Sequence, residues 1–122
     1  MKVGTIGWVD LTVENADALR DFYQQVAGWT CEPVDMGGYA DYTMKPDAGA
    51  DGVAGICHSR GVNVGLPPTW LIYIVVEDLA AALQACRDGG GSVVYESPQM
   101  PMAVIRDPAG AHAALYQATP DA

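Results

Sequence analysis

Three side chains in this sequence have the chemistry for proton transfer: the carboxylate of Asp10 and the imidazoles of His58 and His112. Imidazole changes its charge near neutral pH, so either histidine suits general acid or base catalysis. A carboxylate that points inward from a strand needs a partner. We therefore expect Asp10 to pair with a cation, to orient a polar ligand or to form a dyad with a histidine. The simpler interpretation is structural, with His58 bonded to the linker that follows it and His112 to the turn that precedes it.

Two tryptophans, Trp8 and Trp70, open similar segments and could recognise a flat or apolar ligand. Indole rings present broad faces on which aromatic groups stack, and ligand pockets are often lined in this way. The alternative is that the two indoles only fill apolar space. The side chains that we predict to line a ligand cavity are Trp8, Asp10, Ile56, His58, Trp70, Ile72, His112, Ala114 and Tyr116.

The elements that would position these residues come from a repeat of about half the chain. Segments 7–13 and 69–75 both have the pattern of a strand, and each precedes an amphipathic helical pattern, over 16–27 and 79–87. Trp8 and Trp70 are 62 residues apart, as are Gly28 and Gly90, which end the two helices. Three further strand patterns follow each helix, so the order β-α-β-β-β occurs twice. The expected strands are 5–13, 29–35, 39–45, 53–58, 69–76, 92–96, 102–106 and 111–117.

Alternation with a period of two assigns the faces of these strands. In the first strand, Leu11 packs toward the helix while Trp8 and Asp10 face inward. In segment 69–76 the prediction places Trp70, Ile72 and Ile74 inward. Segments 53–58 and 111–117 match each other with a shift of 58 residues. That match turns Cys57 outward, and the side chains that it places inward are Ile56, His58, His112, Ala114 and Tyr116.

The paired units resemble the vicinal oxygen chelate superfamily, which includes glyoxalase I, methylmalonyl-CoA epimerase, extradiol dioxygenases and bleomycin-resistance proteins. The resemblance rests on the segment VDLTVENADALRDFYQQVAGW (9–29), on segment 70–91 and on DPAGAHAALYQ (107–117). It implies an α+β fold in which two β-α-β-β-β modules form a cupped, mostly antiparallel eight-stranded sheet with the helices outside. We expect one domain, with module one over 1–59, a linker over 60–68 and module two over 69–122.

Metal-binding members of this superfamily hold the ion with histidine and glutamate side chains from the first, fourth, fifth and eighth strands. The resemblance places Trp8, Ile56, Trp70 and Ala114 at these positions. An indole N–H only donates hydrogen bonds, and the other two side-chain types are apolar, so none of the four can coordinate a cation. We therefore predict no metal and no cofactor.

Three hypotheses for the function follow. The first is metal-independent binding of a small aromatic or amphipathic molecule in the cupped sheet. The second is a metal-independent lyase or isomerase that uses Asp10 with a histidine, so that Asp10, His58 and His112 are the candidate catalytic residues. The third is a structural or partner-binding module without a ligand. Superfamily members commonly pair their modules between chains, so the resemblance also implies a homodimer.

Composition excludes several other classes. The chain has 122 residues, of which 50% are hydrophobic, and this suits one folded domain. The net charge is −9 and the six Lys and Arg residues form no patch, so we predict no nucleic-acid partner. The three cysteines are odd in number and form no CxxC, which favours a reducing cytoplasm. No apolar run is long enough to span a bilayer, so no membrane partner is expected.

Overall fold

A computed structural model describes residues 2–119 and contains eight strands and two α-helices in the predicted order. The predicted α+β fold is confirmed. The chain divides into two compact units. The α1 unit comprises Val9–Trp70, and the α2 unit comprises Leu71–Ala122 together with Met1–Trp8. In the part of the chain that the structure describes, no helix is long and apolar enough to cross a membrane.

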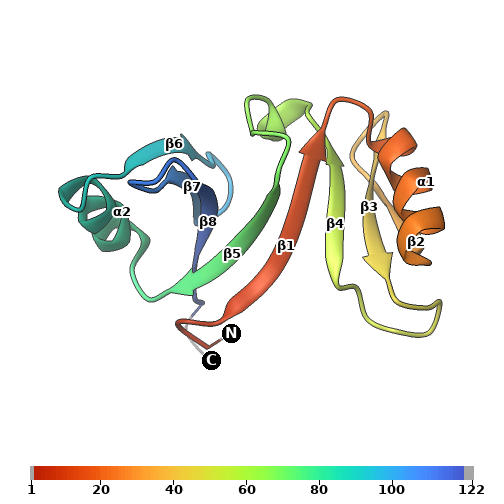
Figure 1. The fold of residues 1–122 in the computed structure, drawn as a ribbon, viewed down its shortest axis with the longest axis horizontal. Coiled ribbons are helices and arrows are strands. Elements are labelled where there is room, and N and C mark those ends of the chain that lie inside the picture. Colours follow the sequence, from red (N-terminus) through yellow and green to blue (C-terminus); the bar gives the residue numbers. More distant parts are fainter. Residues whose placement is uncertain (1, 120–122) are drawn as a thin grey trace. The chain divides into compact units, whose positions relative to one another are not determined.

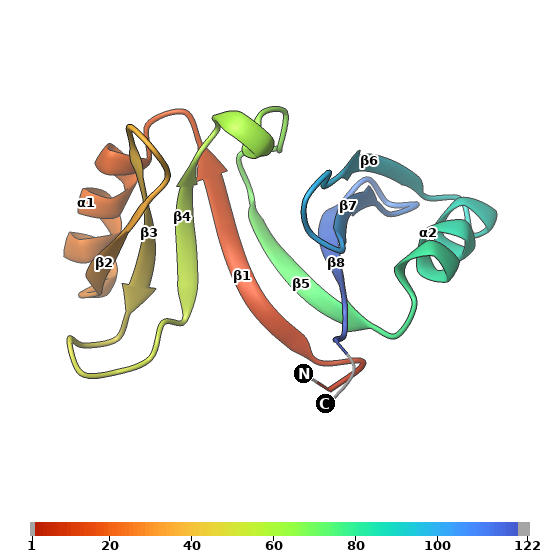
Figure 2. The same ribbon diagram turned by 180° about the vertical axis from the view of Figure 1, so that it is seen from behind.

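The α1 unit contains β1 (Ile6–Val13, whose first residues belong to the α2 unit), α1 (Ala16–Ala27), β2 (Thr30–Asp35), β3 (Ala40–Lys45) and β4 (Ala54–His58). The strand order is β2-β3-β4-β1, with the β4–β1 pair parallel and the other pairs antiparallel. Figure 1 shows α1 lying along β2 and β3. After β4 the chain makes a short 3₁₀ turn, η1 (Gly61–Asn63), which is visible at the end of β4 in Figure 2.

Local sequence signals fix where α1 begins and ends. The side chain of Asn15 accepts a hydrogen bond from the backbone N–H of Ala18 at 3.1 Å, as an N-cap does. Gly28 ends the helix with a φ of 71°, in the left-handed region that favours glycine. The buried residues beneath the helix are Ala16, Tyr42, Met44 and Ile56, packed against Val13, Leu19 and Tyr23 among others.

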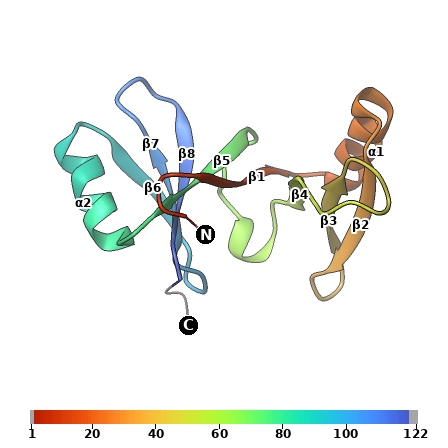
Figure 3. The same cartoon turned by 90° about the horizontal axis from the view of Figure 1, so that it is seen from below.

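The α2 unit repeats this architecture. It contains β5 (Trp70–Val76, whose first residue belongs to the α1 unit), α2 (Leu79–Asp88), β6 (Ser92–Glu96), β7 (Met102–Arg106) and β8 (His112–Gln117). The strand order is β5-β8-β7-β6, with a parallel β5–β8 pair. Figure 3 shows α2 beside β6 and β7. The core beneath α2 consists of Leu83, Ala103 and Leu115, against which Ile74, Val76 and Ile105 pack.

The register between the two units differs by one residue from the prediction. The helix caps Asn15 and Asp78 are 63 residues apart, not 62. In the parallel pairs, Val13 lies opposite His58 and Val76 lies opposite Gln117, so β4 and β8 correspond with a shift of 59 rather than 58. Because side chains alternate, a slip of one residue inverts the faces of a strand. The predicted faces are therefore wrong for β4 and β5.

Candidate functional site

The candidate site lies on the face of the α1 unit's sheet that points away from α1. Leu11 pairs with Ile56, which is in the core beneath the helix, so the alternate residues of β1 and β4 occupy the opposite face. There Asp10 pairs with Gly55 and Thr12 pairs with Cys57. In β3, Thr43 also pairs with Gly55, and Asp41, two residues away, shares its side of the strand.

This face gathers polar side chains that are largely shielded from water. Thr12 is 2% exposed and Asp41 is 6% exposed, while Asp10 is half-buried. One carboxylate oxygen of Asp41 accepts a hydrogen bond from the backbone N–H of His58 at 2.8 Å. A buried carboxylate needs such donors because an unpaired charge is costly away from water. Asp41 is therefore fixed in place by β4.

The Cys57 thiol stays protonated on this face. Burial raises its pKa well above the ordinary value, and the negative charges of Asp10 and Asp41 and a hydrogen bond with Asp41 raise it further. The thiolate is the nucleophilic form of cysteine, so Cys57 is suited to donating a hydrogen bond and not to attacking a substrate. On this face, the Asp10 carboxylate can accept a hydrogen bond from a ligand or accept a proton from it.

His58 does not lie on this face, which corrects the prediction. Its Nδ1 is 2.9 Å from the carbonyl oxygen of Ala40, an acceptor, so this contact requires the tautomer with a proton on Nδ1. Its Nε2 is 3.8 Å from a carboxylate oxygen of Asp17. The ring meets Tyr39 edge to face, with the centroids 5.6 Å apart. The imidazole is thus held on the α1 side, and a dyad with Asp10 is wrong.

Asp17 also accepts a hydrogen bond from Tyr42, a contact that sequence reasoning did not predict. The Tyr42 hydroxyl donates to a carboxylate oxygen of Asp17 at 2.5 Å, and the Arg20 guanidinium lies 4.6 Å from the Tyr42 ring centroid. The hydrogen bond to Asp17 and burial both raise the pKa of Tyr42, and the positive charge of Arg20 opposes them. This network joins the first turns of α1 to β3 and is structural.

Trp70, Ile56 and Ile72 were also predicted on the wrong face. The Trp70 indole N–H donates to the Tyr23 hydroxyl at 3.2 Å, and its ring lies edge to face with those of Tyr23 and Trp29, at 5.3 and 6.1 Å. Ile56 is 0% exposed in the core beneath α1. Ile72 is two residues from Ile74 in β5, so it shares the face of Ile74, which packs beneath α2. These three side chains therefore lie on the helix sides of their strands and not on the predicted inward face.

In the α2 unit, the residues predicted on β8 do lie on the face away from α2. Leu115 packs beneath the helix, so its neighbours Ala114 and Tyr116 take the opposite side. Ala114 is 0% exposed, and Val75 and Val104 on the same face are also buried. His112 pairs with Arg106 at the end of this face. Trp8 is half-buried in the same unit.

Comparison with known proteins identifies the family. Residues 8–116 match the protein-family model described as a glyoxalase-like domain. The chain belongs to the glyoxalase-like family. This confirms the resemblance to the vicinal oxygen chelate superfamily inferred from the sequence.

This glyoxalase-like domain is similar in sequence to several named proteins. A protein from Mycobacterium tuberculosis named "Putative glyoxylase CFP32" is 36% identical over 96% of this chain and 47% of its own length. The anthracycline biosynthesis protein DnrV from Streptomyces peucetius is 32% identical over 88% of this chain and 39% of its own length. The glyoxalase-like domain thus spans about half or less of the length of these relatives.

Solved structures show the same fold at low sequence identity. The crystal structure of a selenomethionine methylmalonyl-CoA epimerase superposes with a TM-score of 0.54 at 15% identity, covering 98% of this chain and 99% of that one. A hypothetical protein from Bacillus halodurans C-125 superposes with a TM-score of 0.59 at 11% identity, covering 97% and 96%.

The residues of the glyoxalase-like domain do not fit the superfamily's metal site. With the register corrected by one residue, the four ligand positions fall on Trp8, Gly55, Leu71 and Ala114. Glycine and alkyl side chains offer no donor atom, and an indole N–H offers no lone pair in the ring plane. Within residues 2–119, no group of three or more His, Cys, Asp or Glu side chains is placed to hold a metal ion.

Proposed function

We propose that this glyoxalase-like domain binds a small organic molecule without a metal ion, through the polar face of the α1 unit. The observation that carries the proposal is the half-buried Asp10 carboxylate beside a protonated Cys57 and a fixed, buried Asp41. In this proposal a ligand hydroxyl or amine donates a hydrogen bond to the Asp10 carboxylate.

The ligand predicted from the sequence is aromatic or amphipathic, and only some of the side chains that supported this prediction still do. Trp70 is committed to Tyr23 and Trp29, so it no longer supports stacking. Trp8 and Tyr116 belong to the α2 unit, where both are half-buried, and they are separate candidates for contact with an apolar group on that unit. Ala114 is 0% exposed and contacts a ligand only if the sheet moves. The names of the relatives, a glyoxylase and anthracycline biosynthesis proteins, support a small-molecule ligand.

A fluorescence and thermal-shift screen tests the proposal. The wild-type protein is screened against hydroxylated and amino-substituted aromatic compounds, and each hit is titrated against Asp10→Asn and Asp51→Asn. Asp51 lies in an exposed loop, so its variant controls for the lost charge. We expect Asp10→Asn to weaken binding by about 1.5–3 kcal/mol, the range for a hydrogen bond to a charged group, and Asp51→Asn to have little effect. Equal loss in both variants, or no hit in the screen, contradicts the proposal.

The second candidate function is a metal-independent lyase or isomerase in which Asp10 is the base. The observation that favours it is the half-buried Asp10 carboxylate, which lies on the same face as the neutral Cys57 thiol, whose proton is donated to Asp41. His112 is the first residue of β8 in the α2 unit, and a step in which Asp10 alone is the base does not require it. Activity that persists in a chelator and disappears in Asp10→Asn would establish this function. Binding with no turnover would leave the first proposal standing.

Two expectations about context complete the proposal. The superfamily resemblance supports a homodimer, which light scattering after size-exclusion chromatography measures directly. A cytoplasmic location fits the unpaired cysteines Cys31, Cys57 and Cys86. A module that only binds a protein partner is the third possibility, and it predicts that the ligand screen fails while a partner is captured.

A further inference from the structure

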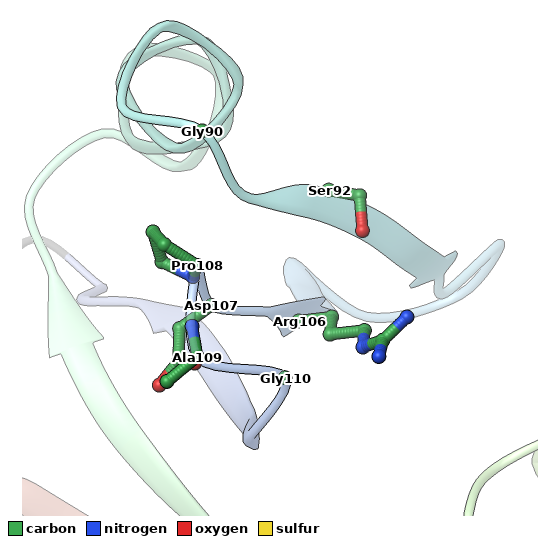
Figure 4. A pocket seen from close by; sticks show the side chains of 7 residues that line it. All are labelled: Gly90, Ser92, Arg106, Asp107, Pro108, Ala109 and Gly110. Carbon is green, nitrogen blue, oxygen red and sulfur yellow. The ribbon is translucent and has the colours of Figure 1, made fainter.

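A polar pocket in the α2 unit lies apart from the residues of the proposed function. It has a volume of about 320 Å³ and is formed where the end of α2 meets the β7–β8 turn. The residues that line it are Gly90, Ser92, Arg106, Asp107, Pro108, Ala109 and Gly110. Figure 4 shows the Ser92 hydroxyl and the Arg106 guanidinium emerging from neighbouring strands beside this turn.

Three polar side chains stand in a row across the sheet, and two of them, Ser92 and Arg106, line this pocket. Ser92 of β6 pairs with Arg106 of β7, and Arg106 pairs with His112 of β8. Residues paired across antiparallel strands share a face, so a hydroxyl, a guanidinium and an imidazole are neighbours. All three can donate hydrogen bonds, and a guanidinium presents a planar fork that matches carboxylate and phosphoryl oxygens.

The Arg106 charge is not neutralised by its acidic neighbour in the sequence. The Asp107 carboxylate is turned into the hairpin, where it accepts the backbone N–H groups of Ala109 at 2.9 Å and Ala111 at 3.0 Å. Among the ion pairs of residues 2–119, none involves Arg106. The cation is therefore left to interact with solvent or with a ligand.

The absence of a side chain at Gly110 leaves room for the Arg106 guanidinium. Its φ of 92° is reserved for glycine, and a Cβ atom there would come within 3.3 Å of Nη2 of Arg106. The missing side chain lets the guanidinium rest directly on the turn.

We propose that this pocket, through Arg106 with Ser92 and His112 beside it, binds a small oxyanion, the carboxylate or phosphoryl group of a small molecule. The proposal concerns residues of the α2 unit only, so it stands or falls independently of Asp10. The net charge of −9 opposes anions at long range, so recognition depends on these local donors.

An NMR titration with inorganic phosphate, and separately with acetate, tests the proposal at fixed pH and ionic strength. We expect saturable shifts of the backbone amides of Ser92 and Gly110. Arg106→Gln should weaken binding by about tenfold or more, the loss expected for one charge-assisted hydrogen bond. The matched control is Arg87→Gln, because Arg87 lies in the same unit at the exposed end of α2, 3.8 Å from Glu96, and carries the same charge.

Each outcome decides the matter. Saturation by both anions supports recognition of any oxyanion. Saturation by phosphate alone supports recognition of a phosphoryl group, and saturation by acetate alone supports recognition of a carboxylate. Shifts that do not saturate in the wild-type protein overturn the proposal without reference to any variant. Equal weakening in Arg106→Gln and Arg87→Gln also overturns it, because that result reports only the net charge.

Discussion

Replacing Ile56 by alanine tests the corrected register in the α1 unit, and Ile72→Ala is its matched control. Both are isoleucines in strands, and the sequence predicted both to line one ligand cavity. In the structure, Ile56 is 0% exposed within the core beneath α1, whereas Ile72 is 37% exposed. The two substitutions remove the same atoms, so they differ only in what surrounds those atoms.

The expected magnitudes follow from burial. Ile→Ala removes three carbons, worth about 0.8 kcal/mol each when fully buried, and a rigid core adds a cavity cost. We therefore expect Ile56→Ala to lower the free energy of unfolding by about 3–4 kcal/mol. At Ile72 part of this area is already in water and no closed cavity forms, so we expect a loss of about 1–1.5 kcal/mol. The lower strand propensity of alanine affects both variants and cancels in the difference.

Urea denaturation followed by circular dichroism at one protein concentration measures both variants. The predicted result is a difference of about 2 kcal/mol between them, with Ile56→Ala the less stable. Equal losses would refute the face assignment of β4. So would a loss below about 1 kcal/mol for Ile56→Ala, which would show that the side chain faces an open cavity instead of a packed core.

The remaining predictions concern protons and helix caps. The pKa of Cys57 is raised in the folded protein, so the unfolded chain loses the thiol proton at a lower pH. The contribution of Cys57 to the free energy of unfolding is therefore complete below about pH 8.5 and is lost as the pH rises further. In Cys57→Ala, the free energy of unfolding should fall less steeply with pH above that value. In the wild-type protein, Cys57 should be the thiol that iodoacetamide labels most slowly. The Asp17 contact raises the pKa of Tyr42, so Tyr42→Phe should cost about 1 kcal/mol at pH 7, and this deficit should shrink as pH rises above about 10. Thermal unfolding of Asn15→Ala and Asp78→Ala should each show a loss of about 1 kcal/mol, and an unchanged stability in either would contradict its role as an N-cap.

The order and type of the elements could be predicted because local chemistry determines them. Asn15 and Gly28 mark the ends of α1 by satisfying backbone groups that the helix leaves open. The alternation of side chains then gives the strands, and two copies of one pattern give the α+β fold. None of these signals depends on contacts between residues distant in sequence.

The faces of β4 and β5 could not be predicted in the same way. Matching Trp8 with Trp70 was persuasive because tryptophan is rare, yet the helix caps show that Leu71 is the true counterpart of Trp8. Trp70 turns to the helix side because Tyr23 and Trp29 offer it aromatic contacts and a hydrogen-bond acceptor. Register depends on backbone pairing, and a slip of one residue was enough to misplace Ile56 and every other side chain of those strands.

The candidate site was found only in part. Asp10 lies on the predicted face, but its neighbours Asp41 and Cys57 were missed, since no face was predicted for 39–45 and Cys57 was assigned outward. A signal was present: Asp41 is a charged residue between Ala40 and Tyr42 in a segment that was predicted to be a strand. A charged residue in such a stretch indicates a specific partner. Here that partner is the backbone of His58.

Metal content tests the central claim most directly, namely that the superfamily's ligand positions are held by side chains that cannot coordinate an ion. The protein is purified without chelator, dialysed against buffer containing zinc, manganese or magnesium, and analysed by inductively coupled plasma mass spectrometry. Because those side chains cannot coordinate an ion, we expect far less than one divalent ion per chain with each metal. One tightly bound ion per chain, removed only by a chelator, would contradict it.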